Sequence, residues 1–544
     1  MTLNRLALLA ALIAVPAAAQ SEIDPARLTE TVRTLASDQF EGRAPGTQGE
    51  DRTIGYLIGR LQALGLEPGM PDGSWTQEVP LLHTRLGDPA RFELATPAGA
   101  IPLAQKDNVY VSSIRDADRA SIAAAPLVFV GYGVKAPERG WDDFKGVDLK
   151  GKVAVFLIND PDFEASKGEA VAGQFGGKRM TYFGRWTYKF EEAARRGAVG
   201  ALIVHDSAGV GYGWNVVISP GGENYALSGQ QTPLHLQGWL EGAAAKRLFA
   251  NAGLDLDKLR VAARSPKFKA LPMPGVTLSA DIPVHRETVI SHNVLARIKG
   301  SAKPDETVMF GAHWDAYGKG APDAQGRVYR AGANDDALGV AGLFEIARAM
   351  KAGPAPRRSA VFAFWTAEER GLLGSEHYAQ HPAWPLDKTV ANLTLDILQT
   401  AGPARDVILV GQGQNTLEDQ MVRVAAAQGR TVTPESLPER GLFYRADHFS
   451  FAKRGVPVLL QMGIAGASDL VTGGTAAGQA WIDRYTGQCY HQACDAWAPD
   501  WDLRGAVMDI DLVGRIGTDL LNSDRWPAWK SGSEFRALRP NPGK

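Results

Sequence analysis

Residues 308–315 read Val-Met-Phe-Gly-Ala-His-Trp-Asp, an apolar run that ends in His313 and Asp315. Short apolar runs of this kind are typical of strands that are buried on both faces of a parallel sheet. Two similar runs follow, each with acidic residues close behind it: Ala360–Trp365 before Glu368 and Glu369, and Val390–Leu395 before Asp396. The sequence therefore predicts parallel strands that carry ionisable side chains at their carboxyl ends.

Strand and helix patterns alternate from residue 288 to residue 521. We expect these elements in chain order: strand Val308–Ala312, helix Ala337–Met350, strand Ala360–Trp365, a helix from Glu369, strand Val390–Leu395, strand Val407–Val410, helix Thr416–Gln428, strand Val456–Gln461 and a helix around Leu503–Leu521. Such alternation predicts an α/β fold, with a mostly parallel central sheet that helices cover on both faces.

A smaller α/β pattern precedes this alternation. Residues 28–64 predict two amphipathic helices. From about residue 126 the pattern changes, with buried strands at 127–131, 152–158 and 198–205 and a helix at 182–196. The predicted division of the chain is a leader at 1–19, a first part of the main domain at 20–122, an inserted small domain at 123–272 and the rest of the main domain at 273–544.

Composition and the N-terminus narrow the class of protein. The 544 residues carry 58 Lys and Arg against 60 Asp and Glu, a net charge of −2, which does not favour binding to nucleic acid. Residues 1–19 combine Arg5, an apolar run and Ala17-Ala18-Ala19, the layout of a cleaved secretory signal, with an uncleaved anchor as the alternative. No later run reaches the roughly 20 apolar residues of a membrane helix. We expect an exported protein, periplasmic or secreted, without stable membrane insertion; its oligomeric state is not predicted.

Two cysteines, Cys489 and Cys494, lie in the segment Cys-Tyr-His-Gln-Ala-Cys. In an exported chain they predict one short local disulfide. Two unpaired thiols are the alternative, because so short a loop closes only with compatible geometry.

The polar residues at the strand ends predict a metal site. Imidazole and carboxylate groups suit zinc and related divalent ions, and open α/β sheets bind ligands at the carboxyl ends of their strands. Asp335 is the natural bridge between two ions, and His313, Glu369 and Asp396 are further ligands. Glu368 would remain free as a general base. Asp315 is placed to accept the second imidazole N–H of His313, which would make its role indirect.

A distant histidine must complete the ligand set. His448, in Ala-Asp-His-Phe-Ser-Phe, and His491, between the cysteines, are both candidates. We favour His491, because the predicted disulfide would hold its loop and Tyr490 beside it offers a phenolic donor for an oxyanion. His448 is kept as a residue that supports the ligands or faces the substrate.

Six motifs occur in one order along the chain: Gly311-Ala312-His313-Trp314-Asp315, Gly332-Ala333-Asn334-Asp335-Asp336, Thr366-Ala367-Glu368-Glu369, Leu395-Asp396, Arg445-Ala446-Asp447-His448 and Tyr490-His491. Together they closely resemble the co-catalytic di-zinc aminopeptidases, exopeptidases related to bacterial secreted aminopeptidases and glutamate carboxypeptidase. The resemblance extends to Gly42-Arg43 and to residues 131–148, which look like part of a protease-associated domain inserted into the zinc exopeptidase fold.

This resemblance implies two zinc ions per chain and a role for each motif residue. The implied roles are His313 and Asp396 on one zinc, Glu369 and His491 on the other, Asp335 as the bridge, Glu368 as general base, Tyr490 at the oxyanion, and Asp336, Asp447 and His448 in support or on the substrate side. It also implies a cis peptide between Asp335 and Asp336.

We therefore expect a secreted zinc aminopeptidase that acts on peptide substrates by removing N-terminal residues. The alternatives are a carboxypeptidase or dipeptidase of the same family, a glutaminyl cyclase with a single zinc, and a receptor-like binding protein that keeps the fold without the chemistry.

Overall fold

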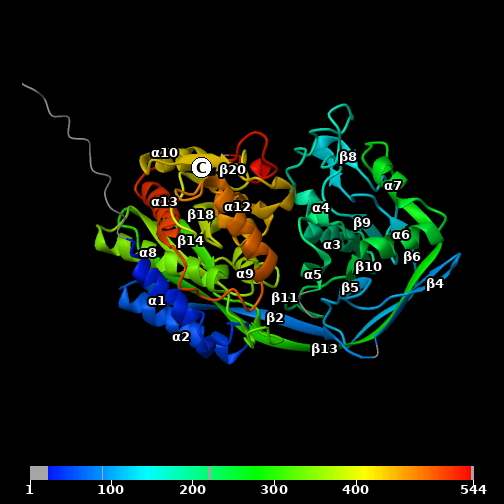
Figure 1. Ribbon diagram of the computed structural model, residues 1–544, viewed down its shortest axis with the longest axis horizontal. Helices are drawn as coiled ribbons and strands as arrows, with labels where there is room; N and C mark the ends of the chain where they lie inside the picture. The colour runs from blue at the N-terminus through cyan, green and yellow to red at the C-terminus, as the bar shows by residue number, and fades with distance from the viewer. Residues whose placement is uncertain (1–22, 89, 219–221, 541–544) are drawn as a thin grey trace, which may run out of the picture.

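The computed structural model describes residues 23–88, 90–218 and 222–540 (Figure 1). The predicted leader at residues 1–19 lies outside these ranges. Within them, no helix combines the length and the apolar character needed to cross a bilayer.

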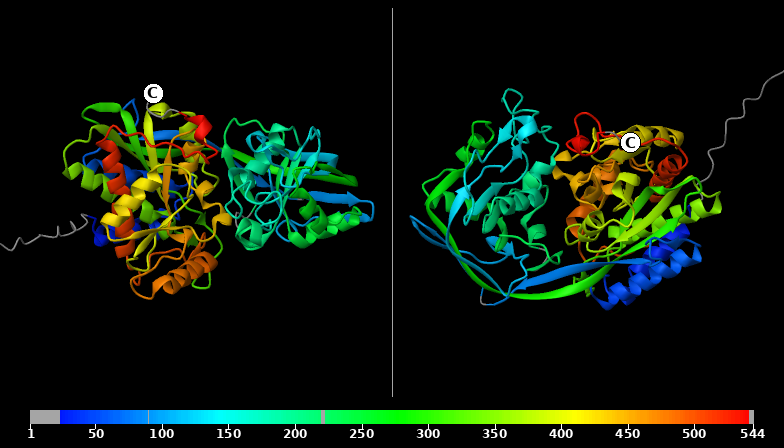
Figure 2. Two further views of the ribbon diagram at one scale, coloured as in Figure 1. Left: turned by 90° about the horizontal axis from the view of Figure 1, so that it is seen from above. Right: turned by 180° about the vertical axis from the view of Figure 1, so that it is seen from behind.

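Two packed units share one long strand. Figure 1 shows the larger unit on the left and the smaller on the right, joined along the lower edge by β2 (Thr76–Leu86) and β13 (Leu271–Ile298). The 28 residues of β13 pair with β17 of the larger unit at one end and with β6 of the smaller unit at the other. The right-hand view in Figure 2, seen from behind, shows the same strand passing beneath both units.

The sheet of the larger unit has four parallel strands on one side, with β21 at the edge. Their order is β21 (Val458–Gln461), β18 (Thr389–Leu395), β14 (Lys303–His313) and β17 (Arg358–Trp365). Antiparallel strands extend the sheet beyond β17: β13 pairs with β17, β2 with β13, and β11 (Glu223–Leu227) with β2. The short strand β1 (Glu67–Pro68) also pairs with β13. The sheet is therefore mixed, and the predicted parallel strands form one side of it.

Helices cover both faces of this sheet, as predicted. One face carries α1 (Pro25–Leu35), α2 (Gln48–Ala63), α8 (Leu338–Ala352), α10 (Leu417–Ala427) and α13 (Arg504–Leu521). The other carries α9 (Leu373–Gln380), α11 (His448–Ala452) and α12 (Gly474–Arg484). Alternate residues of β14 serve the two cores, because Val308 and Phe310 pack on the first face and Met309 on the second.

Two local expectations differ from the structure. The helix predicted from Glu369 begins at Leu373, after a turn that leaves Glu368 and Glu369 outside it. Strand β19 (Asp406–Leu409) pairs with β20 (Thr431–Pro434) in a separate ribbon and not with the central sheet. Two other short ribbons are β7 (Lys135–Ala136) with β8 (Trp141–Asp142), and β15 (Gly318–Lys319) with β16 (Tyr329–Arg330).

The smaller unit has its own α/β core. Its parallel strands run in the order β6 (Arg119–Phe129), β9 (Val153–Leu157), β10 (Gly200–Val204) and β12 (Leu236–Leu240). The antiparallel strand β5 (Val109–Ser112) pairs with β12. On the other side, β13 pairs with β3 (Arg91–Thr96), which in turn pairs with β4 (Gly99–Pro102). Its helices are α3 (Trp186–Arg195), α4 (Ser207–Val210), α5 (Trp214–Val217), α6 (Gly242–Asn251) and α7 (Leu256–Ala263). Its main core draws side chains from Leu94 to Val284. The domain limits stay a prediction, but β3 to β5 precede residue 123, and the limit at 272 falls within β13.

A disulfide joins Cys489 and Cys494, as predicted, in the loop that follows α12. This loop carries Tyr490 and His491, and the residues after it lead to α13.

Arg43 ties three chain segments together from inside the larger unit. Its side chain is fully buried, and its guanidinium donates to the main-chain oxygens of Leu35, Trp314, Ala331 and Gly332. Because Trp314 follows His313 and Gly332 precedes Asp335 by three residues, one cation fixes both segments that carry these side chains.

Replacing Arg43 by lysine should lower the stability of the larger unit by at least about 3 kcal/mol, because an ammonium cannot serve four carbonyl groups and buried acceptors lose their partners. Urea unfolding followed by tryptophan fluorescence measures this. The control is Arg60→Lys, whose only ion pair with a described residue is a 3.9 Å contact with Glu30; it should change stability by less than about 0.5 kcal/mol. Equal effects of the two variants would contradict the role of Arg43.

Candidate metal centre

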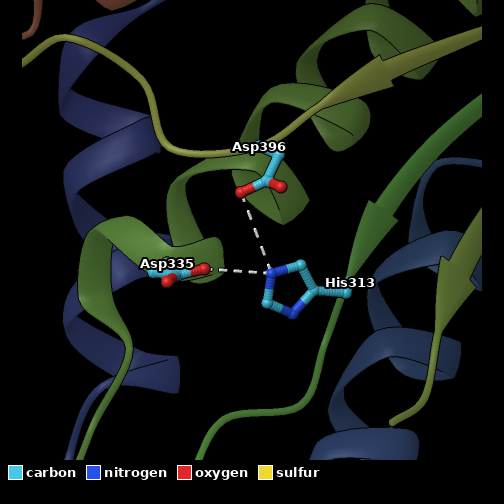
Figure 3. Close-up of side chains that lie close together, drawn as sticks. All are labelled: His313, Asp335 and Asp396. Atoms are coloured by element: carbon cyan, nitrogen blue, oxygen red, sulfur yellow. Dashed lines mark hydrogen bonds and ion pairs between the residues drawn. The ribbon is translucent and has the colours of Figure 1, made fainter. Parts of the chain in front are cut away.

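Three side chains from different loops form a first group of ligand atoms. His313 ends β14, Asp396 follows β18, and Asp335 lies in the turn before α8. Figure 3 shows the two carboxylates directed at one nitrogen of the imidazole. His313 Nε2 lies 3.1 Å from Asp335 Oδ1 and 4.0 Å from Asp396 Oδ1. All three side chains are buried.

A second group adjoins the first and shares Asp335. His491 Nε2 lies 3.1 Å from Glu369 Oε2 and 3.5 Å from Asp335 Oδ2. The two carboxylate oxygens of Asp335 therefore face the two histidines, one each. Among the described residues these two triplets are the groups of histidine, cysteine and acid side chains that could hold a metal ion, each with its ligand atoms within 4.8 Å of one another.

Local backbone structure directs these side chains into one place. The peptide between Asp335 and Asp336 is cis, as the resemblance implies. The Asp336 carboxylate accepts the main-chain N–H groups of His313 at 3.2 Å and Gly339 at 3.0 Å, which joins the end of β14 to the start of α8. After β17, Ala367 adopts a left-handed conformation with φ of 51°, and the chain reverses there before Glu368.

Acidic side chains outnumber histidines in this cluster, and their charged forms are disfavoured by burial. Burial raises the pKa of Glu368 and of Glu369 well above the usual glutamate value, and that of Asp396 to about 8. Burial also lowers the pKa of His491 to about 3, so its imidazole is neutral, the form that binds metal ions. His313 differs, because its carboxylate neighbours outweigh burial and raise its pKa.

The donor atoms fit divalent metal ions such as zinc. His313 Nδ1 lies 3.0 Å from the main-chain oxygen of Asp315; a carbonyl oxygen only accepts, so Nδ1 carries the hydrogen. The lone pair of Nε2 then faces an Asp335 oxygen, an arrangement that needs a proton or a cation between the two atoms. The buried Oδ1 of Asp396 has no hydrogen-bond partner among the described residues. Imidazole nitrogen and carboxylate oxygen together are the ligand set of zinc.

Glu368 lies beside the ligands without belonging to either triplet. Its carboxylate is 3.9 Å from His313 Nε2, and the side chain faces the same cavity. The Asp315 carboxylate accepts the main-chain N–H of Glu368 at 3.0 Å, whereas it lies 3.6 Å from His313 Nδ1. Asp315 thus holds the imidazole mainly through its main-chain oxygen, and its side chain positions the Glu368 turn. This differs from the predicted carboxylate contact because that carboxylate points toward the neighbouring loop.

Tyr490 lines the cavity next to His491, with ring centroids 3.7 Å apart. Its hydroxyl lies 3.3 Å from Nη2 of Arg445. A guanidinium only donates, so the tyrosine oxygen accepts there and its hydrogen is free to point elsewhere.

The structure places Asp447 and His448 away from the cavity in front of the centre. His448 begins α11, and this short helix packs its first residue into the core, where the ring contacts Phe443 edge-on with neither ring nitrogen hydrogen-bonded among the described residues. It is not one of the described residues that line the cavity, so it does not face the substrate side. Asp447 is buried behind the ligands, which raises its pKa to about 7, and it too is absent from the described cavity wall.

Two residues that the sequence did not reveal complete the centre. The Asp495 carboxylate accepts the main-chain N–H groups of Asn334 at 3.0 Å and Asp335 at 3.1 Å, and the hydroxyl of Tyr485 at 3.0 Å. Tyr317 places its hydroxyl 3.1 Å from His491 Nδ1. Asp495 follows Cys494 directly, and this proximity to the His491 loop was the one signal that could have identified it.

Both units contribute to a cavity of about 390 Å³ in front of this centre. Asp335, Glu368 and Tyr490 line it from the larger unit, and Arg185 and Tyr212 from the smaller. A cavity of this size suits a small molecule or the end of a peptide.

Comparisons with known proteins agree with this location of the site. Residues 293–513, which hold all five proposed ligands, match the model of Peptidase family M28. Over 215 residues the chain is 31% identical to Leupeptin-inactivating enzyme 1 of Streptomyces exfoliatus, a match that covers 38% of this chain and 43% of that protein. Over 113 residues it is 37% identical to Aminopeptidase NAALADL1 of Mus musculus, a match that covers 20% of this chain and 14% of that protein. The matches thus span less than half the length of these relatives.

Two solved structures align over most of the chain at low identity. The aminopeptidase from Aneurinibacillus sp. strain AM-1 aligns with a TM-score of 0.49 and 18% identity, covering 91% of this chain and 93% of that one. BSAP, a zinc aminopeptidase from Bacillus subtilis, aligns with a TM-score of 0.44 and 17% identity, covering 92% of this chain and 96% of that one. The match of residues 293–513, together with the motif order and the site they form, assigns this part of the chain to a domain of peptidase family M28.

Proposed function

We propose that this protein is a zinc-dependent exopeptidase, and more narrowly an aminopeptidase that removes N-terminal residues from peptides. One observation carries the proposal: two triplets of ligand atoms share Asp335, and the carboxylate of Glu368 remains free beside them. The names of the relatives, which include aminopeptidases and a glutamate carboxypeptidase homolog of Caenorhabditis elegans, support a peptidase and leave the end of the peptide to be tested.

Two zinc ions per chain would be held by five residues. His313 and Asp396 would bind one ion, Glu369 and His491 the other, and Asp335 both, which follows the two triplets. Zinc in such a site polarises a carbonyl group and acidifies water.

Glu368 would move the proton of the reaction. Its carboxylate takes a proton from the water whose oxygen attacks the scissile carbonyl carbon, and then passes that proton to the leaving nitrogen as the C–N bond breaks. Atoms balance, because the water supplies OH to the new carboxyl group and H to the new amine. The buried position of Glu368 in the cavity wall limits exchange of this proton with bulk water.

Tyr490 would stabilise the oxyanion that forms during the attack. The Arg445 guanidinium donates to the phenolic oxygen at 3.3 Å, which leaves the phenolic hydrogen for the substrate oxygen and makes it a stronger donor.

The substrate and location in this proposal rest on other features. The cavity, closed on one side by the smaller unit, suits a chain end better than the middle of a long peptide. Export to the periplasm or the medium rests on the sequence of residues 1–19 alone.

Metal removal is the first test. The purified protein should lose hydrolysis of alanine p-nitroanilide when a chelator removes its metal, and zinc should restore it at about two ions per chain. Peptides with a free amino terminus should be cleaved from that end, and N-acetylated copies should not. Cleavage of the N-acetylated copies from the carboxyl end would show a carboxypeptidase activity and contradict the aminopeptidase assignment. Activity without metal would refute the proposal as a whole.

Glu368→Gln should reduce kcat by about 100- to 10,000-fold, because the amide cannot take up the proton. Zinc content should stay near two per chain, since Glu368 belongs to neither triplet. Glu78→Gln, an exposed glutamate on β2, is the control and should keep full activity. Retained turnover in Glu368→Gln would exclude it as the base.

Asp495→Asn should weaken zinc binding by about 10- to 100-fold, because one of its two oxygens becomes an N–H donor that faces main-chain N–H groups. Competition with a metal indicator measures the affinity. Asp500→Asn, an exposed neighbour, should leave the affinity unchanged. If Asp495→Asn binds zinc as tightly as the unaltered protein, the turn of Asp335 does not depend on this carboxylate.

A further inference from the structure

Strand β11 forms an edge of the larger sheet next to the metal centre. It pairs antiparallel with β2, and no other strand of the described chain pairs with it. Figure 1 shows β11 lying along β2 between the two units. An unpaired strand edge presents main-chain N–H and C=O groups that can pair with another chain, so proteins usually cover such edges or keep them out of reach.

The register shows which main-chain groups of β11 are free. The N–H of Ser228 donates to the main-chain oxygen of Pro80 at 2.9 Å, which makes these two residues a hydrogen-bonded pair. Hydrogen-bonded and non-hydrogen-bonded pairs alternate in an antiparallel ladder, and counting back from Ser228 places Tyr225 and Glu223 in pairs of the second kind. The main-chain N–H and C=O groups of Glu223 and Tyr225 therefore point away from β2.

This free edge faces the cavity in front of the centre. Four consecutive residues, 223–226, line the cavity, together with Glu368 and Tyr490. Successive side chains of a strand point to opposite faces, so a cavity over one face would contact only every second residue. The cavity thus runs along the edge of β11, where the free groups of Glu223 and Tyr225 point.

One end of β11 lies close to the loop that carries the general base. Arg370, in the loop after β17, places its guanidinium carbon 5.3 Å from the ring centre of Tyr225. Leu227, at the carboxyl end of β11, belongs to the same small core as Ala367, the residue before Glu368. A chain paired with β11 would therefore have one of its ends at the centre.

Contacts on both faces hold β11 in position. On one face the ring of Tyr225 stacks on that of His83, with centroids 4.4 Å apart and an angle of 12° between the planes. On the other face Asn224 Nδ2 donates to Ser112 Oγ at 3.3 Å. Because these contacts already order the strand, little further conformational entropy is lost when a second strand pairs with it.

We propose that the substrate peptide binds as an added strand on β11, with the main chain of its leaving part paired to Glu223 and Tyr225. This inference rests on the proposed peptidase function and extends its substrate class to extended peptides longer than a dipeptide. Such pairing tolerates many side-chain sequences, because every residue except proline supplies the same main-chain N–H and C=O groups. With its N-terminal residue at the centre, the peptide would run antiparallel to β11.

Peptide length is the first test. On the zinc-loaded full-length protein, kcat/KM for removal of the first residue should rise at least about tenfold from alanyl-alaninamide to a hexapeptide amide of alanine and serine, the effect of about two added hydrogen bonds. Both substrates have a blocked carboxyl end, so a terminal charge does not contribute. Equal kcat/KM values for the two lengths would overturn the proposal.

Ester substitution then locates the hydrogen bonds. In four further hexapeptide amides, the N–H of the third, fourth, fifth or sixth residue is replaced by an ester oxygen, which removes one donor and keeps the side chain. Only alternate residues of an added strand turn their N–H groups toward β11. Two of the four esters, at every second position, should therefore lower kcat/KM by about three- to tenfold. Loss at every position, or at none, would contradict strand pairing.

Two variants of one residue separate the main chain from the side chain. Tyr225→Pro removes an N–H of the free edge and keeps the pairs with β2, whereas Tyr225→Ala removes only the ring. The proline variant should lower the ratio of kcat/KM between hexapeptide and dipeptide at least about threefold more than the alanine variant. Equal loss in both would assign the preference to the ring and refute main-chain pairing. If thermal unfolding shows that Tyr225→Pro does not fold, the ester series decides.

Binding without turnover separates this inference from the proposed function. In calorimetry, zinc-free protein should bind the unsubstituted hexapeptide amide at least about threefold more tightly than two of the four esters, at every second position, and equally tightly as the other two. This pattern in a protein that cleaves no peptide after zinc loading would refute the peptidase function and retain the strand site. Equal binding of all five peptides, or of none, would overturn the strand site whatever the activity.

Discussion

The position of the Asp335 carboxylate between two imidazoles is the constraint on which the centre depends. Its two oxygens face His313 and His491, which come from residues 178 positions apart. That position requires three separate restraints: the guanidinium of Arg43 on the preceding carbonyls, the carboxylate of Asp495 on the main-chain N–H groups, and Asp336 across the end of β14. The protein's own contacts thus help to fix the loop, which lowers the cost of organising the ligands.

The parts of the centre that sequence reasoning identified are those that follow regular structure. A buried parallel strand needs an unbroken apolar run, and polar residues at its carboxyl end must lie at one edge of the sheet. His313, Asp396 and the Glu368-Glu369 pair could be found in this way, and the disulfide and the cis peptide were also predicted correctly. Their assignment to individual zinc ions remains a proposal.

The parts that were missed depend on contacts between distant segments. Asp495 and Tyr317 act through hydrogen bonds to other segments of the chain, for which no local sequence pattern exists. Strand β13 was missed for a different reason. Pro272, Pro274 and Pro283 indicate breaks, and the structure accommodates them with register shifts against β6 and with positions where no ladder N–H is required. For the same reason the predicted domain limit falls inside a continuous strand.

The continuity of β13 has a consequence for how such a protein could have evolved. Because the same strand supplies backbone pairing to both sheets, the smaller unit cannot be exchanged for an unrelated module by recombination at its borders without exposing unpaired amide groups in the larger unit. We therefore expect the two units to diverge together, and changes in the wall that faces the cavity to arise by point substitution more readily than by shuffling of whole segments.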